Sequence, residues 1–244
     1  MALARDLKLV LHMARGPGRE GCQKDRMERL YRGQAADYDA FRDRFLHGRR
    51  ELYQALAPAP GSRLVELGGG TARNLEFLAG GPAGLGKAWV VDICPSLLAI
   101  GRQRRDRLGW TNVELQEGDA TSWRPPGGAV DTVVFSYSLT MIPLWFKAVD
   151  NALSMLAPGG RLAVVDFFGA PKHPGRDGRR RSALHRAFWR AWFGHDDVFP
   201  NPDHPAYLDY RTRRLHFSEH RGRVPYLPLL KAPYYRFIGE KPAS

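Results

Sequence analysis

The stretch Arg63–Asn74, with the sequence R-L-V-E-L-G-G-G-T-A-R-N, decides the fold of this chain. Its first part, Leu64–Leu67, is a short apolar run that carries one acid, Glu66, and it predicts a buried strand. Three consecutive glycines follow, namely Gly68, Gly69 and Gly70. A glycine turn between a strand and a helix lets the backbone approach a ligand closely, and the helix N-terminus offers unpaired N–H groups. The stretch therefore predicts a parallel α/β fold that binds a nucleotide-like ligand at this turn.

The spacing of the glycines restricts the kind of ligand. The dinucleotide fingerprint G-x-G-x-x-G fails because Arg73 stands at its third glycine, and the Gly-Lys-Ser/Thr of a P-loop is absent. The pattern E-x-G-x-G-x-G fits, with Ala72 at the last glycine, and resembles motif I of the class I S-adenosylmethionine (SAM)-dependent methyltransferases. Thr71 is expected to cap a helix that begins near Ala72, where a negative φ would tolerate the turn. A glycine turn without a ligand is the alternative for this stretch taken alone.

A second strand that ends in an acid agrees with the same family. Lys87–Asp92 is the predicted strand, and the I-C-P-S that follows leads into a helix to about Leu108. An acid at the end of the second strand accepts hydrogen bonds from both ribose hydroxyls in dinucleotide folds. We assign that role to Asp92 and include Ile93 beside it in the cofactor site.

The remaining core strands follow in the order of the family. Val113–Gln116 predicts the third strand, and the resemblance implies that Asp119 after it pairs with the adenine amino group, next to the backbone of Ala120. The fourth and fifth strands are predicted at Asp131–Phe135 and Arg161–Phe167, with the turn A-P-G-G before the fifth as another family hallmark. The resemblance implies a Rossmann-like class I fold, with a seven-stranded, mostly parallel sheet in the order 3-2-1-4-5-7-6.

Composition limits the compartment and the partners. The chain has 244 residues, 43% hydrophobic content and no apolar run long enough to cross a membrane, and no signal peptide is expected. Its two cysteines, Cys22 and Cys94, suggest reduced thiols in a cytoplasmic protein. The net charge of +12 favours anionic partners, either nucleic acid or an anionic membrane surface, although many basic proteins bind neither.

The N-terminal part of the chain is expected to be helical. Residues 2–14 have apolar side chains at helical spacing, which suits either an interfacial helix or a helix packed on the core. A second helical region is predicted from about Lys24 to Ala57, with a break near Gly33. We therefore expect two parts, a helical lid over residues 1–57 and a methyltransferase domain over residues 58–244.

Three residues of the N-terminal part are candidates for contacts with the cofactor. The resemblance implies that a tyrosine-bearing segment folds over SAM, which assigns Tyr31 and Tyr38 to the cofactor site, although both rings could simply pack. Arg49 could pair with the methionyl carboxylate of SAM through two hydrogen bonds, but an arginine exposed to solvent is the commoner case.

The segment after the fourth strand is expected to carry the acceptor side of the site. It reads S-Y-S-L-T-M-I-P and precedes a helix from about Leu144 to Leu156. The family presents the acceptor at this point, so Tyr137 is the first choice for a residue near the chemistry, with Ser136 assigned to the cofactor. Further along, the arginines of residues 170–181 and a Trp/Phe-rich helix after them suit either lipid headgroups or nucleic acid.

The C-terminal part is expected to complete the sheet. The segment from His195 to Asp209 carries His and Asp among prolines, but its spacing matches no zinc signature, and no metal is expected. The runs R-R-L-H-F-S-E-H and Y-Y-R-F-I-G-E then predict the sixth and seventh strands as an antiparallel hairpin, which is the methyltransferase arrangement.

Stretches outside the cofactor core resemble one narrower family, the betaine-lipid N-methyltransferases. They are Y-D-A-F-R-D-R-F-L-H-G-R-R, F-S-Y-S-L-T-M-I-P-L-W-F-K-A-V-D-N-A-L, and F-S-E-H-R-G-R-V-P-Y-L-P with A-P-Y-Y-R-F-I-G. The resemblance covers roughly residues 25–241 and implies SAM-dependent conversion of diacylglyceryl-homoserine to diacylglyceryl-N,N,N-trimethylhomoserine, with S-adenosylhomocysteine as the other product. It further implies peripheral association with the inner face of a membrane and functional pairing with an upstream aminocarboxypropyl transferase.

Methyl transfer to an amine requires a dry pocket that holds nitrogen and methyl near contact, and it requires no metal or covalent nucleophile. An aromatic wall of Tyr137, Trp145 and the C-terminal tyrosines could contact the quaternary ammonium product by cation–π attraction, or it could be ordinary core. A primary amine must also lose a proton, for which His216, Asp166 and the tyrosines are candidates. The substrate residues are therefore assigned as Tyr137, Trp145, His216 and Arg223.

Several other functions remain open at this point. The acceptor could be a quinone ring or a phospholipid amine, which would keep the methyltransferase chemistry. An RNA methyltransferase agrees with the charge, but F-S-Y-S stands where an N-P-P-Y-like motif would be expected, so nucleic acid is an unlikely partner. A SAM-binding protein without catalysis is the third alternative.

Overall fold

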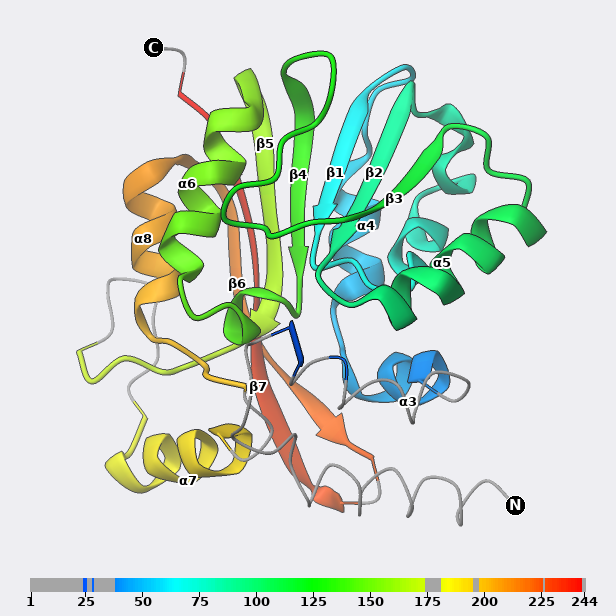
Figure 1. Ribbon diagram of the computed structural model, residues 1–244. Helices are drawn as coiled ribbons and strands as arrows, with labels where there is room; N and C mark the ends of the chain where they lie inside the picture. Colours follow the sequence, from blue (N-terminus) through cyan, green and yellow to red (C-terminus); the bar gives the residue numbers. More distant parts are fainter. Residues whose placement is uncertain are drawn as a thin grey trace, which may run out of the picture.

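A central sheet of seven strands organises the chain, and the predicted strand order is confirmed. The computed structural model describes residues 24–25, 28, 38–173, 181–194, 198–225 and 227–242. The strands lie in the order β3-β2-β1-β4-β5-β7-β6 (Figure 1). They are β1 (Arg63–Leu67), β2 (Lys87–Asp92), β3 (Val113–Glu117), β4 (Val130–Ser136), β5 (Leu156–Phe167), β6 (Arg213–Val224) and β7 (Leu227–Glu240). The first five strands run parallel, and β7 is antiparallel to both β5 and β6.

Helices cover both faces of the sheet, as a parallel sheet requires. The α-helices are α3 (Tyr38–Phe45), α4 (Arg49–Leu56), α5 (Pro95–Arg107), α6 (Trp145–Met155), α7 (Ala183–Gly194) and α8 (Asp203–Arg211). Short 3-10 helices are η1 (Arg73–Phe77), η2 (Gly81–Gly84) and η3 (Leu139–Met141). Side chains of α4, η1 and α5 join the core on one face, and side chains of α6 and α8 join the core on the other.

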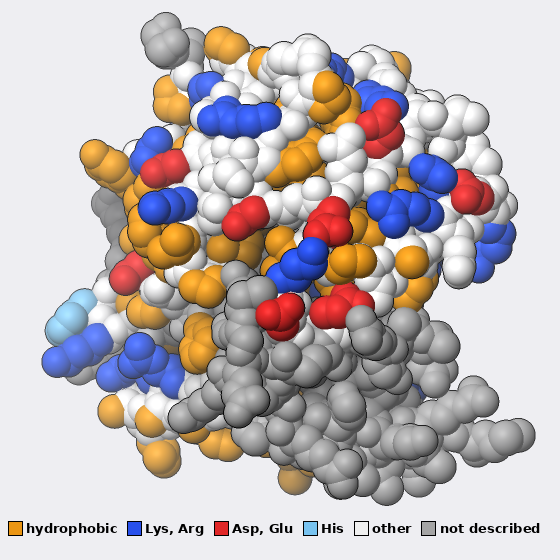
Figure 2. All heavy atoms as spheres, viewed as in Figure 1, with side chains coloured by type: hydrophobic (Ala, Val, Ile, Leu, Met, Phe, Trp, Pro, Cys, Tyr) orange, Lys and Arg blue, Asp and Glu red, His pale blue; other side chains and the backbone are white. Residues whose placement is uncertain are grey.

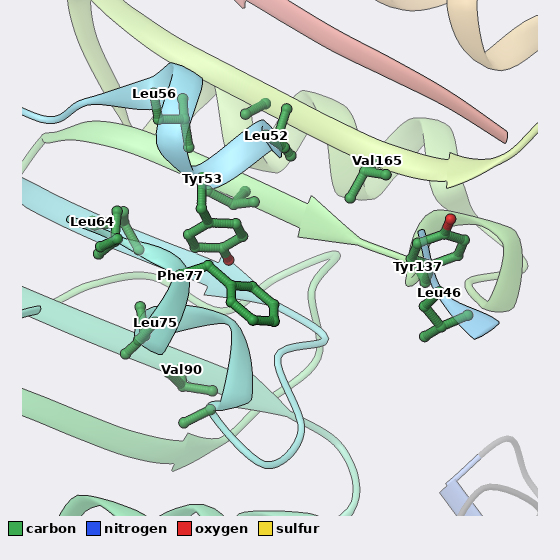
Figure 3. Close-up of a cluster of buried hydrophobic side chains, with 14 of the residues drawn as sticks. Leu46, Leu52, Tyr53, Leu56, Leu64, Leu75, Phe77, Val90, Tyr137 and Val165 are labelled. Carbon is green, nitrogen blue, oxygen red and sulfur yellow. The ribbon is translucent and has the colours of Figure 1, made fainter. Parts of the chain in front are cut away.

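Alternation along the strands divides the core into these two layers. Leu64 of β1 faces the α4 layer, where Leu52, Tyr53 and Leu56 pack on it, while Val65 faces the α6 layer (Figure 3). Because α3 and α7 lie beyond the carboxyl ends of β1, β4 and β5, they enclose the edge at which parallel α/β sheets bind ligands.

Three local predictions differ from the structure. The helix after the glycine turn is only the 3-10 helix η1, and Ala72 before it has φ +58°, not a negative value. Thr71 does not cap that helix, because its hydroxyl donates to Asp39 Oδ1 instead. The N-terminal helices break at Gly48, which has φ +82°, whereas the predicted break near Gly33 lies outside the described residues, as does the predicted helix over residues 2–14.

Candidate active site

The glycine turn is closed tightly against the ends of three strands. Gly68 has φ +72°, and its N–H donates to the carbonyl of Val91 at 2.7 Å. A Cβ at Gly68 would lie 2.5 Å from the Cβ of Ser138, whose hydroxyl donates to the carbonyl of Leu67. A Cβ at Gly69 would lie 2.6 Å from Val90 Cγ1. The turn therefore has no room for side chains, which is why glycine occupies these positions.

Asp92 is attached to the same turn. Its Oδ2 accepts a hydrogen bond from the N–H of Gly70 at 2.9 Å, and its Oδ1 accepts one from the N–H of Cys94 at 2.9 Å. Burial raises the pKa of Asp92. Ile93 is half-buried between Asp92 and Cys94. A half-buried carboxylate at the end of β2 fits the predicted contact with ribose hydroxyls, which stays a prediction.

Glu66 is a fully buried acid on β1 next to the turn. Its Oε1 accepts from Asn74 Nδ2 at 2.5 Å, while its Oε2 has no hydrogen-bond partner among the described residues. Burial raises the pKa of Glu66 to about 7, although the hydrogen bond from Asn74 opposes this shift. The hydroxyl of Tyr53, which is also buried, lies near Glu66 and likewise opposes the rise of its pKa.

This raised pKa predicts a stability that depends on pH. Because the folded chain holds the Glu66 proton up to about pH 7 and the unfolded chain releases it near pH 4.5, the free energy of unfolding should fall as pH rises between these values. Each unit of pKa shift corresponds to about 1.4 kcal/mol. Thermal unfolding of Glu66→Gln between pH 4.5 and 8 should therefore show a weaker decline than the unchanged protein shows.

A second buried acid, Asp166, also makes the free energy of unfolding depend on pH. Burial raises the pKa of Asp166 to about 6, so part of the decline should persist in Glu66→Gln. Identical pH profiles for the two proteins would contradict the assignment of the raised pKa to Glu66.

The first described helix clamps the loop that contains the glycine turn. On α3, Asp39 Oδ1 accepts from the hydroxyl of Thr71 at 2.7 Å, and its Oδ2 accepts from Arg104 Nη2 at 2.5 Å. One turn further along α3, Asp43 Oδ2 accepts from Arg73 Nη2 at 2.9 Å. The sequence analysis did not identify either acid as part of the site. Their spacing of i and i+4 places them on one side of α3 and could have indicated a pair of acids that binds basic side chains elsewhere. These contacts hold α3 over the predicted cofactor site.

Arg49 lies near the site but already has protein acceptors. It is buried at the start of α4, where its Nε donates to the carbonyl of Leu46, its Nη1 to Asn74 Oδ1 and its Nη2 to Asp43 Oδ1. Its pairing with a carboxylate of the cofactor stays a prediction, and these three bonds argue against it.

A different arginine, Arg42 of α3, faces the glycine turn. Its Nη1 would lie 3.8 Å from a Cβ at Gly70, and its charge lowers the pKa values of Glu66 and Asp92 against the effect of burial. Sequence reasoning missed Arg42 because an arginine in a helix rich in charges is usually exposed to solvent.

The other predicted cofactor residues are spread around the same edge. Asp119 is exposed, and its Oδ1 accepts from the N–H and the hydroxyl of Thr121 at 2.8 and 2.7 Å. Ala120 is buried, and its carbonyl accepts from Asn151 Nδ2 at 2.9 Å. Ser136 is buried at the end of β4. Tyr31 and the side chain of Tyr38 lie outside the described residues.

Tyr137 has an unusual position directly after β4. It adopts φ +54°, a conformation that costs most residues about 1–2 kcal/mol, and its side chain is buried. Its hydroxyl donates to the backbone carbonyl of His47 at 2.7 Å, and its ring packs edge-on to Phe167 at 4.7 Å. The ring of Phe167 also packs against the rings of Phe45 and of Phe193 on α7, with distances between ring centroids of 5.4 and 4.2 Å. Tyr137 therefore belongs to a buried aromatic cluster at the carboxyl edge.

Trp145 does not join this cluster, so the predicted wall of Tyr137 and Trp145 is wrong. The ring of Trp145 lies in the α6 layer and packs edge-on to the rings of His204 and Tyr207, with distances between ring centroids of 4.6 and 5.3 Å. Tyr137 lies in the α4 layer on the opposite face of the sheet. Tyr137 turns toward the α4 layer with its positive φ, whereas Trp145 begins α6, which packs on the other face, and this could not be seen from their spacing in the sequence.

The remaining predicted substrate residues differ in their distance from Tyr137. His216 is exposed in the middle of β6, opposite Ile238 of β7, and its Nε2 lies 2.9 Å from the hydroxyl of Ser218. Arg223 lies at the far end of β6, where its backbone carbonyl is 2.9 Å from His47 Nε2. Only Arg223 is therefore connected to Tyr137, through His47.

Asp166 is a buried acid close to Tyr137. Its Oδ1 accepts from the hydroxyl of Thr140 at 2.7 Å and from the N–H of Phe167 at 2.8 Å, and its Oδ2 accepts from the N–H of Thr140 at 3.2 Å. The charge of Asp166 helps burial to raise the pKa of Tyr137 well above its usual range. Asp166 interacts electrostatically with Tyr137, but it stands between Val165 and Phe167 on β5, so its side chain faces the α6 layer.

The described residues contain no group of three or more His, Cys, Asp or Glu side chains that could hold a metal ion. No helix in the described part of the chain is both long and apolar enough to cross a membrane.

Comparison with known proteins identifies a family. A family model described as a methyltransferase domain matches residues 38–214. The ubiquinone/menaquinone biosynthesis C-methyltransferase UbiE of Roseobacter denitrificans is 29% identical over 163 residues, which cover 62% of this chain and 63% of that protein. The protein of the same name from Cereibacter sphaeroides is 32% identical over 149 residues, or 56% of this chain and 57% of that protein. The chain thus matches only about three fifths of the length of these relatives.

Solved structures agree on the fold. A putative methyltransferase from Bacillus halodurans superposes with a TM-score of 0.64 at 14% identity, covering 80% of this chain and 99% of that one. The N-methyltransferase NodS from Bradyrhizobium japonicum, solved in complex with S-adenosyl-L-homocysteine, gives a TM-score of 0.58 at 18% identity, covering 80% and 86%. Since the family model spans residues 38–214, most of the chain, the chain belongs to the methyltransferase domain family.

Proposed function

We propose that this chain transfers methyl groups from SAM to the amino nitrogen of diacylglyceryl-homoserine and yields the trimethylated betaine lipid. One observation carries the proposal. The three segments that resemble betaine-lipid N-methyltransferases outside the cofactor core, which lie far apart in the sequence, all meet around His47 next to Tyr137.

The contacts of His47 describe this meeting point. Its carbonyl accepts from the hydroxyl of Tyr137 after β4, and its Nε2 lies 2.9 Å from the carbonyl of Arg223 on β6. Its ring stacks near Tyr234 of β7 at 6.2 Å, and a Cβ at Gly222 would lie 1.9 Å from the ring. Such close packing gives a reason why these segments, outside the cofactor core, resemble those of the betaine-lipid N-methyltransferases. It supports a common acceptor site at this edge.

The chemistry requires the chain to position two reactants and to exclude water. SAM supplies an electrophilic methyl group on a sulfonium when it is bound. The glycine turn, Glu66 and Asp92 would hold it, and the aromatic cluster of Tyr137, Phe167 and Phe193 would line the acceptor side. Aromatic faces attract the ammonium of a methylated amine, which favours an N-methyl acceptor.

The N-terminal part is proposed to act as the lid. Its described residues support this role, because Glu28 Oε2 accepts from the hydroxyl of Ser96 at 3.1 Å and from the thiol of Cys94 at 2.9 Å, next to Asp92. Lys24 forms an ion pair with Glu117 at the end of β3. We further propose peripheral association with the inner face of a membrane and functional pairing with an upstream aminocarboxypropyl transferase, which would supply the lipid acceptor.

Asp92→Ala should weaken SAM binding by about 10-fold or more. The change removes hydrogen bonds to a charged group, which contribute roughly 1.5–3 kcal/mol. Calorimetric titration of the purified protein measures the effect. Asp106→Ala, on the exposed surface of α5, is the matched control and should bind SAM normally. Unchanged affinity in Asp92→Ala would remove this residue from the ribose role.

Arg42→Ala tests which arginine serves the cofactor. Because Arg42 faces the glycine turn, Arg42→Ala should weaken SAM binding by about 10-fold, as expected for loss of a charge-assisted hydrogen bond. Arg44→Ala on the same helix is exposed and serves as control. Equal affinities in the Arg42 and Arg44 variants would exclude Arg42.

Methylation of a quinone ring is the second candidate function. It is favoured by the relatives, which are named as ubiquinone/menaquinone C-methyltransferases. A flat ring could also stack on the aromatic cluster around Phe167, so the cluster alone does not decide between the two acceptors.

Separate assays with each acceptor distinguish methylation of the lipid from methylation of the quinone. Purified protein with methyl-labelled SAM is given diacylglyceryl-homoserine, a demethylated quinone or RNA, and the products are identified by mass spectrometry. The proposal expects mono-, di- and trimethylated lipid in sequence, with no loss of activity in the presence of a chelator. Label in the quinone and none in the lipid would replace the proposed acceptor while leaving the methyltransferase assignment intact.

A further inference from the structure

The helix α7 has a stripe of large apolar side chains that are exposed in the described part of the chain. Leu184, Phe188 and Trp192 follow one another at i, i+4 and i+8, so they lie on one side of the helix, and their side chains are 80%, 42% and 38% exposed. The opposite side packs on the core through Trp189 and Phe193, which are buried. Monomeric proteins seldom expose three large apolar side chains in a row without a partner for them.

Basic side chains lie on the other side of α7, beside the residues that pack on the core. A pocket of about 170 Å³ between α7 and the end of β5 has the basic side chains Lys172, Arg186 and Arg190 in its wall, with His185 beside them. No acidic side chain is among the described residues that line it. Figure 2 shows Lys and Arg side chains gathered above hydrophobic ones in the region of α7, at the lower left.

The tip of the β6–β7 hairpin adds to the same end of the molecule. Both α7 and the hairpin extend beyond the carboxyl ends of the parallel strands (Figure 1). Val224 and Leu230, on either side of the tip, pack against the core that contains Trp189 and Phe193. Leu229 at the tip is 99% exposed. The stripe and the hairpin tip therefore belong to one end of the protein.

We infer that this end, formed by the exposed stripe of α7 and the β6–β7 tip, is the surface that docks on an anionic lipid bilayer. A helix with large apolar side chains on one side and basic side chains on the other is the pattern of helices that lie in the membrane interface. Leu184, Phe188 and Trp192 would enter the acyl boundary, and the basic side chains Arg186 and Arg190 would remain on the protein side of the helix, near the headgroups. The charge of +12 complements such a surface.

This orientation also connects the bilayer to the proposed chemistry. The buried side of α7 contributes Phe193, which contacts Phe167 at 4.2 Å, and Phe167 contacts Tyr137 at 4.7 Å. A single helix thus separates the docking surface from the acceptor side of the site. The inference adds to the proposed lipid acceptor but does not require it, because docking is measured without turnover.

Sedimentation with vesicles tests the inference. The full chain should bind phosphatidylcholine vesicles that contain phosphatidylglycerol, and binding should fall with added salt and without the anionic lipid. Leu184→Ser should weaken binding by about 10-fold, because a large apolar side chain no longer leaves water. Arg190→Glu should weaken it by a similar factor of about 10 at low salt.

Matched controls lie at the opposite edge of the sheet, at the end of α5. Leu108 is 43% exposed and Arg107 is exposed there, so Leu108→Ser and Arg107→Glu should bind vesicles like the unchanged protein. Equal losses in the α7 and α5 variants, equal binding to neutral vesicles, or a preference for RNA over vesicles at the same salt would overturn the inference. Leu184 is so exposed that Leu184→Ser should keep the melting temperature, which is checked in parallel.

A short-chain, water-soluble diacylglyceryl-homoserine separates this inference from the proposed function. Methylation of the soluble lipid by Leu184→Ser at the normal rate, with loss of activity on vesicles, supports both. Normal vesicle binding without methylation of either lipid leaves docking in place and removes the proposed acceptor. Methylation of the soluble lipid with no dependence of vesicle binding on α7 leaves the function and removes the docking surface.

Discussion

Gly69→Ala is expected to lower the affinity for SAM by about 100-fold, corresponding to roughly 2.7 kcal/mol. The added Cβ would lie 2.6 Å from Val90 Cγ1 and 3.0 Å from Glu66 Cδ. Both neighbours are fully buried on central strands and cannot move away, so the turn itself has to shift. A turn that shifts no longer presents its backbone to the ligand, and overpacking should also destabilise the fold by about 1–3 kcal/mol.

Gly84→Ala is the matched control for this experiment. Gly84 lies in η2, and a Cβ there would meet no atom within 4 Å. Calorimetric titration with SAM and thermal unfolding should therefore show no change for Gly84→Ala. If Gly69→Ala folded and bound SAM as tightly as the control, the glycine turn could not be the cofactor site.

Tyr137→Ala is expected to lower the rate of methyl transfer by about 100-fold, because a small displacement of a positioning group can have an effect of that size. SAM affinity should change much less, since Tyr137 contacts Phe167 and His47 on the acceptor side. Removal of a buried aromatic side chain should also lower the free energy of unfolding by about 3–5 kcal/mol. The rate is therefore measured well below the melting temperature of the variant.

Tyr137→Phe separates the ring from the hydroxyl. Because the hydroxyl already donates to the carbonyl of His47, we expect it to fix the loop rather than to touch the acceptor. The variant should lose about 1 kcal/mol of stability and only a few-fold in rate. Tyr235→Phe, fully buried in the other layer of the core, is the control. A 100-fold loss in Tyr137→Phe would assign the hydroxyl, and not the ring, to the acceptor.

Much of the cofactor half of the molecule could be predicted from the sequence. The strand Lys87–Asp92 was predicted with its observed bounds, and Asp92 indeed reaches the glycine turn through the N–H of Gly70. These features are local, because a buried parallel strand appears as a short apolar run and the turn after it needs glycine. The sheet order followed from the resemblance to class I methyltransferases and is confirmed.

The acceptor half could not be predicted in the same way. Tyr137 and Trp145 are close in sequence, yet they lie in different layers of the core, whereas Tyr137 and His47 are far apart and share a hydrogen bond. Arg42 faces the glycine turn, although its sequence context resembles that of an ordinary exposed arginine. Such contacts depend on which side of a strand or helix each residue faces and on which distant segment packs there.

The sequence by itself therefore determined where the parallel strands lie, the glycine turn and the positions of the acids Glu66 and Asp92, because each depends on the residue types of one short segment. Only the tertiary structure decided that Ala72 and Tyr137 adopt positive φ values, that α3 clamps the turn and that α7 turns an apolar stripe outward. The physical reason is that packing between distant segments can impose a strained backbone angle or leave a helix face uncovered, and local preferences do not reveal either outcome.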